Sequence, residues 1–210
     1  MSDAHARSVV DQLRAHDVSD ERVLAAMGRV PRELFVPTSE RAHAYADAAL
    51  PIGWGQTISQ PAMVAMICEL LALEGDEHVL DVGTGSGYQA AVLAELAAEV
   101  HSIERVPELA ARARENLREA GYAERVTVHV GDGSRGDPEH APFAAIAVAA
   151  SAPAVPPSLV EQLEPDGRLV LPVGTRYDQE LRLVVRTAEG PRVTRSVPCR
   201  FVPLVGEEGW

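Results

Sequence analysis

The feature that most constrains the fold of this chain is a regular alternation of short apolar runs and helical patterns between His78 and Leu171. The apolar runs have the length of strands and contain few polar residues, as is typical of strands buried on both faces. Strand–helix alternation of this kind folds into a parallel sheet with helices on both sides. The predicted strands are His78–Val82, Val100–Ile103, Val126–Val130, Ala145–Val148 and Arg168–Leu171, and the predicted helices are Tyr88–Ala97, Pro107–Ala120 and Pro156–Leu163.

The segments on either side of this alternation follow other patterns. The N-terminal part shows two helical patterns separated at Asp17–Asp20, then a stretch rich in Pro and Gly at Val30–Gly55, then a helix that begins at Pro61. From Gln179 onward, apolar and polar residues alternate around a turn at Glu189–Pro191, which predicts a hairpin. We therefore predict an α/β, Rossmann-like, doubly wound fold with a mostly parallel sheet, an N-terminal helical extension and C-terminal antiparallel strands.

A glycine-rich turn, Asp81 to Gly87, follows the first predicted strand. Its spacing is G-x-G-x-G, which differs from the G-x-G-x-x-G of dinucleotide enzymes. In open parallel sheets ligands bind beyond the carboxyl ends of the strands. Glycines let a ligand approach the main chain, and the start of the next helix favours an anionic group such as a methionine carboxylate. The predicted cofactor contacts in this turn are Asp81, Gly83, Thr84, Gly85, Ser86 and Gly87.

Acidic residues end the next two predicted strands. Glu104, followed by Arg105, comes 21 positions after Gly83, where a carboxylate can accept hydrogen bonds from both hydroxyls of a ribose. Asp132, followed by Gly133, ends the third strand, where a carboxylate can hold an adenine amino group. The turn and the two acids together predict S-adenosyl-L-methionine as the cofactor. A nicotinamide-dependent oxidoreductase and a non-catalytic cofactor-binding protein are the alternatives, which calorimetry with each cofactor and an activity assay distinguish.

Charge and composition limit the classes of partner. The formal net charge is -12 and all 19 basic residues are Arg, so the chain repels phosphate backbones and anionic lipid surfaces. No Asn-Pro-Pro-Tyr type motif, which holds a flipped base, is present, and no stretch has the character of a signal peptide or a membrane span. The two cysteines and seven histidines show no metal-ligand spacing, so no metal is expected. We expect a monomer in the cytoplasm that binds neither nucleic acid nor membranes.

Several segments resemble the protein-L-isoaspartate O-methyltransferase family. The most extensive is Tyr45–Pro61, and its most specific part is Gln56-Thr57-Ile58-Ser59-Gln60-Pro61. The resemblance spans nearly the whole chain. Its other parts are Arg29–Pro37, Val79–Ala90, Gly131–Ser134, Pro138–Phe143 and Arg200–Gly206.

The resemblance implies methyl transfer to the free α-carboxylate of an isoaspartyl residue in a damaged protein or peptide, followed by closure to a succinimide and partial repair. Ser59 matches the family's active-site serine and would orient the carboxylate, although a serine before Pro61 is also typical of a helix N-cap. Because a carboxylate with a pKa near ~4 is ionised at neutral pH, the reaction needs no strong base. The implied substrate-binding residues are Asp47, Ile52, Gln56, Thr57 and Ile58 in a lid, and Val202, Pro203 and Leu204 in the wall of a peptide groove.

The chain departs from the family pattern at a few positions. Many members have His where Ala62 stands, Trp where Asp137 stands, and Thr where Ala149 stands. These differences leave peptide specificity open, and methylation of a normal aspartate to a stable aspartimide is a within-family alternative. We expect one methyltransferase domain over residues 1–210, with N-terminal helices and the substrate loop in 1–75, the cofactor-binding core in 76–175, and the hairpin and tail in 176–210.

Overall fold

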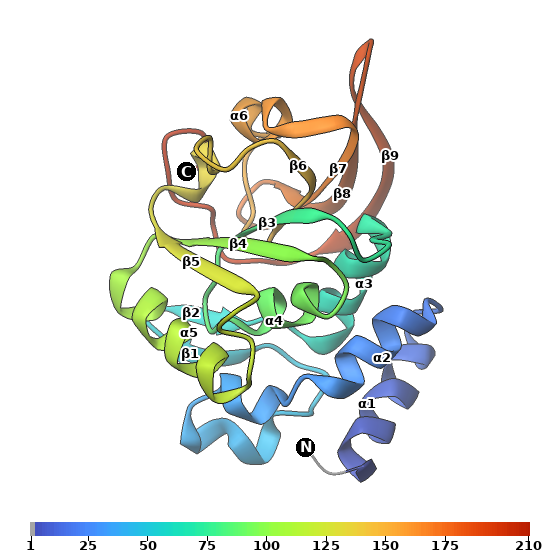
Figure 1. The fold of residues 1–210 in the computed structure, drawn as a ribbon, viewed down its shortest axis with the longest axis vertical. Helices are drawn as coiled ribbons and strands as arrows, with labels where there is room; N and C mark the ends of the chain where they lie inside the picture. Colours follow the sequence, from blue (N-terminus) through green and yellow to red (C-terminus); the bar gives the residue numbers. More distant parts are fainter. Residues whose placement is uncertain (1–2) are drawn as a thin grey trace.

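The computed structural model describes residues 3–210 and is built on a seven-stranded sheet (Figure 1). The strand order is β5-β4-β3-β6-β7-β8-β9, so the chain begins the sheet in the middle and moves outward in both directions. The predicted doubly wound α/β fold is confirmed. The strands are β3 (His78–Val82), β4 (Glu99–Glu104), β5 (Val126–Val130), β6 (Phe143–Val148), β7 (Leu163–Gly174), β8 (Gln179–Thr187) and β9 (Gly190–Cys199).

Parallel pairing holds from β5 to β7, and antiparallel pairing joins β7, β8 and β9. The change occurs where the helices stop, because neighbouring strands joined by short turns must run in opposite directions. In the register of the central pair, Leu80 lies beside His101 and Val82 beside Ile103. The C-terminal antiparallel strands that the sequence predicts are therefore confirmed.

Helices cover the two faces of the sheet unequally. On one face lie α3 (Pro61–Leu71), α4 (Tyr88–Ala94) and α5 (Pro107–Glu119), while the short α6 (Pro157–Glu161) lies on the other (Figure 1). Each face has its own apolar core, because alternate strand residues point to opposite sides of the sheet. The larger core also includes the N-terminal helices.

The N-terminal extension packs outside the first helical layer. It consists of α1 (Asp3–Ala15), α2 (Glu21–Arg29), and two 3-10 helices, η1 (Arg32–Phe35) and η2 (Thr38–His43). Asp20 caps α2 by accepting hydrogen bonds from the Arg22 and Val23 amides. The sequence predicts only irregular chain for Val30–Gly55, but this stretch contains both 3-10 helices and β1 (Leu50–Gly53), which pairs with β2 (Gln56–Ile58) as a hairpin.

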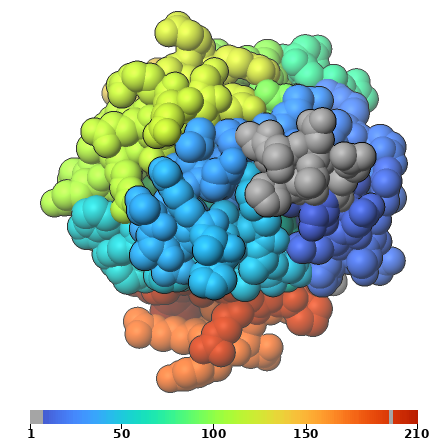
Figure 2. Space-filling model, turned by 90° about the horizontal axis from the view of Figure 1, so that it is seen from below, coloured from blue at the N-terminus to red at the C-terminus, as the bar shows by residue number. Residues whose placement is uncertain are grey.

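Seen from below, the light-blue and cyan segment that includes η2 and the β1–β2 hairpin lies between the N-terminal helices and α5 (Figure 2). Red and orange atoms, which include those of β8 and β9, lie at the lower edge of this view. No helix among residues 3–210 combines the length and the apolar character that crossing a membrane requires.

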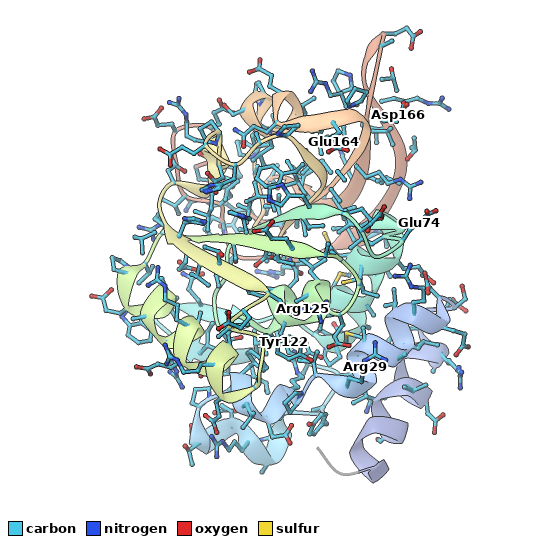
Figure 3. The ribbon with its side chains drawn as sticks, viewed as in Figure 1. Arg29, Glu74, Tyr122, Arg125, Glu164 and Asp166 are labelled. Carbon is cyan, nitrogen blue, oxygen red and sulfur yellow. The ribbon has the colours of Figure 1, made fainter. Side chains whose placement is uncertain are left out.

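A polar cluster around Glu95 joins the extension to the core. Glu95 pairs with Arg29 of α2, accepts a hydrogen bond of 3.1 Å from the Tyr122 hydroxyl, and lies 3.9 Å from Arg125. Figure 3 labels Arg29, Tyr122 and Arg125, which come from α2 and from the segment between α5 and β5. The cluster thus links elements that are distant in the sequence.

Two predicted helices are shorter in the structure. The helix that begins at Tyr88 ends at Ala94 rather than Ala97, and the helix predicted over Pro156–Leu163 spans Pro157–Glu161. At the end of α3, Ala72 adopts a left-handed conformation and terminates the helix before Gly75. Helix ends are decided by local capping geometry, which apolar periodicity does not specify.

Candidate active site

The glycine turn between β3 and α4 has a main chain that depends on its glycines. Gly83, Gly85 and Gly87 have φ values of 91°, 54° and 92°, a region that glycine enters without steric cost. The amides of Gly83 and Thr84 both donate to the Ile103 carbonyl, at 2.9 and 3.1 Å. These bonds fix the turn to β4 and present its main chain at the carboxyl edge of the sheet.

Asp81 lies beneath this turn and does not line the cavity described below. Its carboxylate accepts hydrogen bonds from Gln89 Nε2 at 2.8 Å and Ser102 Oγ at 2.7 Å. Ser102 Oγ lies 2.6 Å from the Thr84 hydroxyl. Complete burial raises the pKa of Asp81 to about 6, although the two hydrogen bonds favour the ionised form. The sequence predicts a cofactor contact for Asp81, whereas the geometry makes it a residue that positions Thr84 and Gln89.

Glu104, at the end of β4, is oriented by main-chain amides. Gly85 donates to Oε2 at 2.8 Å, and Val106 donates to Oε1 at 2.9 Å. Each carboxylate oxygen can accept more than one hydrogen bond, so Glu104 keeps acceptor capacity toward the cavity that it lines together with Arg105. This arrangement fits the ribose contact that the sequence predicts.

Asp132, at the end of β5, holds the C-terminal tail instead of lining the cavity. Its Oδ1 accepts from the Ser134 amide and hydroxyl at 2.9 and 2.7 Å, and its Oδ2 accepts from the Glu207 amide at 2.8 Å. Burial alone would raise the pKa of Asp132, but these hydrogen bonds outweigh it and hold the pKa below its usual value. The neighbouring Gly133 does line the cavity, as predicted.

The β1–β2 hairpin forms the flap that the family resemblance implies. Gln56, Thr57 and Ile58 line the cavity, whereas Ile52 is buried beside the glycine turn. Asp47 does not reach the cavity. Its carboxylate accepts from Gln60 Nε2 at 2.6 Å and from the Ala62 amide at 3.3 Å, and it pairs with His16 at 2.6 Å. Asp47 therefore anchors the start of α3.

Ser59 is not the N-cap of α3, which is Gln60 and has no side-chain cap bond. Within residues 3–210 the Ser59 hydroxyl has no hydrogen-bond partner, so it is available to a ligand. The carbonyl of Ser59, in contrast, is fixed by a hydrogen bond of 2.7 Å from Arg32.

Arg32 is a buried cation that fixes the flap in place. Its side chain donates to the carbonyls of Ala44 and Ser59, each at 2.7 Å, and its guanidinium lies 4.6 Å from the centre of the Tyr88 ring. Only a planar guanidinium can span these two carbonyls while stacking on an aromatic ring. Arg32 thus sets the position of the main chain that carries Ser59.

Two adjoining cavities meet at Ser59. The first lies over the glycine turn and the second lies between the flap and the C-terminal segment; their volumes are about 880 and 1140 Å³, each including its open mouth. Thr57, Ser59, Ala149 and Val202 line both. The first cavity is also lined by Gly83, Thr84, Gly85, Ser86, Glu104, Arg105, Gly133, Pro203 and Leu204, and the second by Gln60, Met63, Arg200 and Phe201.

This distribution revises part of the predicted site. Val202 lines both cavities, but Pro203 and Leu204 line only the first cavity and not the second, which has the position of the predicted peptide groove. Gly87 lies behind the turn, where an added Cβ would meet Leu117 at 3.1 Å. Gly87 therefore allows α4 to pack closely against α5.

The first cavity suits S-adenosyl-L-methionine. Gln89 lines it, and the Gln89 amide oxygen is buried and has no hydrogen-bond partner among the described residues. A buried acceptor without a partner is costly, so this oxygen favours a ligand with a donor such as an ammonium group. Glu104 offers further acceptor sites for hydroxyls.

Sequence reasoning missed the roles of Arg32 and Gln89. Both residues lie in segments that resemble the family, Arg29–Pro37 and Val79–Ala90, but no periodicity or motif assigns either of them a role. Their roles depend on the Ser59 carbonyl and on Asp81, which only the fold brings into contact with them.

Comparisons with known proteins agree with this geometry. The family profile described as protein-L-isoaspartate(D-aspartate) O-methyltransferase matches residues 4–209. A protein-L-isoaspartate O-methyltransferase of Hyperthermus butylicus is 53% identical over 219 residues, covering 99% of this chain and 91% of the relative. A protein-L-isoaspartate O-methyltransferase 2 of Marinobacter nauticus is 55% identical, covering 100% and 96%.

Two solved structures are similar over almost the whole chain. A protein-L-isoaspartate O-methyltransferase superimposes with a TM-score of 0.87 and 27% identity, and the match covers 97% of this chain and 66% of that longer one. A structure from Plasmodium falciparum, solved in complex with S-adenosyl-L-homocysteine, has a TM-score of 0.83 and 26% identity, covering 94% and 97%.

Proposed function

The chain belongs to the protein-L-isoaspartate(D-aspartate) O-methyltransferase family, and from this premise we propose that Ser59 orients the substrate carboxylate at the junction of the two cavities. The reaction is methyl transfer from S-adenosyl-L-methionine to the free α-carboxylate of an L-isoaspartyl residue, which initiates repair through a succinimide. The shared lining at Ser59 is the single observation that carries the proposal, because the reacting oxygen and the methyl group must meet between the two cavities.

The cofactor supplies a methyl group on a positively charged sulfur. Gln89 and Glu104 hold the cofactor in the first cavity, and the glycine turn shapes its floor. Thr84 and Gln89 keep their positions because Asp81 and Ser102 bond to them from below. The residues of this cavity therefore bind and orient, and none has to remove a proton.

The second cavity is the groove that holds the damaged peptide. Arg200 is exposed and lines the groove, where its charge attracts a carboxylate, and the apolar side chains of Met63 and Phe201 lie beside it. The Ser59 hydroxyl donates a hydrogen bond to one carboxylate oxygen and leaves the other oxygen directed at the first cavity. Alignment of this kind is worth ~7–11 kcal/mol of the barrier in well-oriented reactions.

We also propose the context in which the enzyme works. The enzyme works as a monomer of one domain, with its flap in 1–75, its core in 76–175 and its hairpin and tail in 176–210, and the single domain is supported by the first cavity, which takes lining residues from all three segments. Two unpaired cysteines support the cytoplasm, and a net charge of -12 disfavours nucleic acid and membranes. Light scattering after gel filtration tests the monomer, which has a mass of 22.5 kDa.

The function is tested with labelled S-adenosyl-L-methionine and matched isoaspartyl and aspartyl peptides. Label should enter only the isoaspartyl peptide. Equal labelling of both peptides, or labelling of the aspartyl peptide alone, contradicts repair and favours aspartimide formation.

The role of Ser59 is tested by Ser59→Ala, with Ser39→Ala as the matched control because Ser39 is exposed on η2. Ser59→Ala should lower kcat for the isoaspartyl peptide about 10- to 100-fold, since loss of the donor misplaces the carboxylate. Calorimetry should show that Ser59→Ala still binds the cofactor. An unchanged kcat would remove Ser59 from the mechanism while leaving the assigned reaction intact.

A further inference from the structure

Four of the seven histidines come together on the face of the sheet opposite α4 and α5, although their spacing in the sequence gives no indication of this. His78 lies at the start of β3, His101 within β4 and His129 within β5, and His140 lies in the loop before β6. Asp137, from the same loop as His140, completes the group. The sequence predicts scattered histidines, and the tertiary structure gathers them.

The distances within this group are those of a coordination sphere. Asp137 Oδ2 lies 2.9 Å from His140 Nδ1, 3.6 Å from His101 Nδ1 and 3.7 Å from His129 Nε2. His101 Nδ1 lies 3.1 Å from His129 Nε2, and all four ligand atoms lie within 4.8 Å of one another. Atoms bonded at about 2.0–2.1 Å to a tetrahedral Zn²⁺ are roughly 3.3 Å apart, and the four separations of 2.9, 3.1, 3.6 and 3.7 Å lie close to that value.

Neighbouring groups hold two of these side chains in the required orientation. Glu99 Oε1 lies 3.3 Å from His101 Nε2, so a proton on Nε2 leaves the Nδ1 lone pair facing the cluster. The Asp137 amide donates to Gln162 Oε1 at 2.7 Å, and Gln162 donates back to the Arg135 carbonyl at 2.8 Å. The loop that carries Asp137 and His140 is therefore fixed before any ion binds.

Two of the four side chains are buried and two are partly exposed, which suits a site that an ion must enter from solvent. The side chains of His101 and Asp137 are 6% and 10% exposed, so water competes poorly for them. The side chains of His129 and His140 are 32% and 37% exposed, so an ion can enter from solvent. Three imidazole nitrogens and one carboxylate oxygen form a donor set that suits Zn²⁺.

We propose that His101, His129, Asp137 and His140 bind one Zn²⁺ in a four-ligand structural site that is separate from the methyl-transfer centre. Because four protein ligands leave no open position, the ion has a structural and not a catalytic role. It ties β4, β5 and the loop before β6 together. The site lies next to the cofactor cavity, since His101 is two residues from Ile103 on β4 and the loop begins beside Gly133, both of which line that cavity.

The alternative is a hydrogen-bonded cluster in which a proton, and no metal, lies between His101 and His129. The zinc site and the metal-free cluster differ in the metal content of the purified protein. We propose treating the untagged full-length protein with a chelator, removing the chelator, and titrating ZnCl₂ by calorimetry, with metal content measured by mass spectrometry. One Zn²⁺ per chain with a Kd below about 1 µM is expected for a structural site. Binding of less than one ion per chain, or binding only at millimolar Zn²⁺, overturns the proposal.

Substitutions locate the ion. His129→Gln and Asp137→Asn should each weaken Zn²⁺ binding by more than about 100-fold, and Glu99→Gln, which only orients His101, by about tenfold. The matched control is His43→Gln, which changes an exposed histidine outside the cluster and should bind as the wild type does. Wild-type affinity in both ligand variants contradicts the assignment.

Thermal unfolding provides a second measurement that does not depend on methyltransferase activity. Zn²⁺ at 100 times its Kd should raise the Tm of the wild type by about 5–10 °C, because the ion binds the folded state alone. Far-ultraviolet circular dichroism confirms that the ligand variants His129→Gln and Asp137→Asn are folded, and their Tm should respond little to Zn²⁺, whereas the Tm of His43→Gln should rise as that of the wild type does. An equal rise in the wild type and the two ligand variants shows that the ion binds elsewhere and refutes the site.

Discussion

Hydrogen bonds link the side chains of Asp81, Ser102 and Thr84 under the glycine turn. Their buried oxygens position the turn without having to contact the cofactor. The carboxylate of Asp81 fixes Gln89 in the same way from its other oxygen. At the residue scale, Glu104, Gln89 and Ser59 line the cavities, while Asp81 holds Gln89 and Arg32 holds the main chain of Ser59 in position.

The buried carboxyl of Asp81 makes a prediction about pH. Its pKa of about 6 in the folded state exceeds the value of ~3.9 expected when unfolded. The stability that Asp81 contributes is therefore fully present below about pH 4 and is lost as the pH rises through about 6. Asp81→Asn has no such titration, so the free energy of unfolding of wild type minus variant should fall between about pH 4 and 7 and then stay level.

Urea unfolding at several pH values measures this difference. Asp76→Asn, at an exposed position, shows in parallel what loss of any carboxylate does to stability. A wild-type-minus-variant difference that is constant from pH 4 to 7 would mean that Asp81 does not titrate in this interval.

The C-terminal tail is the element that closes the first cavity from above. The Ser151 amide donates to the Val202 carbonyl and the Leu204 amide donates to the Ser151 carbonyl, which places Val202 to Val205 in the cavity wall. Beyond them, Asp132 accepts from the Glu207 amide, and Trp210 Nε1 donates to the Ser151 carbonyl at 2.9 Å. The tail is therefore held by polar contacts at several points. The contact at Asp132 depends on pH, because its acceptor is a carboxylate.

Acidification should loosen this tail. Because the pKa of Asp132 is lowered in the folded state, its contribution is present above the unfolded value of ~3.9 and is lost as the pH falls through the folded value. Trp210 reports the change, and Trp54→Phe removes the other tryptophan. Fluorescence of Trp210 should shift below about pH 4 in this background, in a range where circular dichroism shows the fold intact.

Asp132→Asn should reproduce the shifted Trp210 emission at pH 7, since the amide accepts the Glu207 bond only weakly. Identical emission of Asp132→Asn and its parent at pH 7 would show that the tail is held without this carboxylate.

At the scale of the whole molecule, the N-terminal extension and the sheet act together because the site takes residues from both. The extension supplies Arg32 and the flap with Ser59, and the core supplies the glycine turn and Glu104. Apolar residues of both parts pack in one core, and the cluster around Glu95 adds a polar link between α2 and the end of α4. Burial raises the pKa of Tyr122, which keeps its hydroxyl proton available to Glu95.

Glu95→Ala should lower the free energy of unfolding by about 1–3 kcal/mol, because Tyr122 and Arg29 then lose a partly buried acceptor. The matched control is Glu180→Ala, which removes a half-exposed carboxylate paired with Arg182 and should change stability by about 0–1 kcal/mol. Urea unfolding measures both. Similar values for the two variants would mean that the cluster does not join the extension to the core.

The order of elements, the parallel core, the glycine turn and the flap sequence follow from the sequence alone. Apolar periodicity determines which face of each element is buried, and the G-x-G-x-G spacing after a strand indicates a tight turn that glycine forms without steric cost. Glu104 is identifiable from the sequence because it ends a parallel strand, and ligands bind at the carboxyl edge of such a sheet.

Only the tertiary structure decided which side chains face a cavity. Asp81, Asp132 and Asp47 each carry a carboxylate near the site, but partners from distant segments, Ser102, Glu207 and Gln60, turn them toward the protein. The histidine cluster also depends on the tertiary structure, because its members come from different strands and loops. His101 and His129, for example, are 28 residues apart in the sequence and 3.1 Å apart in the fold. A hydrogen bond or a ligand set depends on distances of about 3 Å between segments, and sequence periodicity contains no information at that scale.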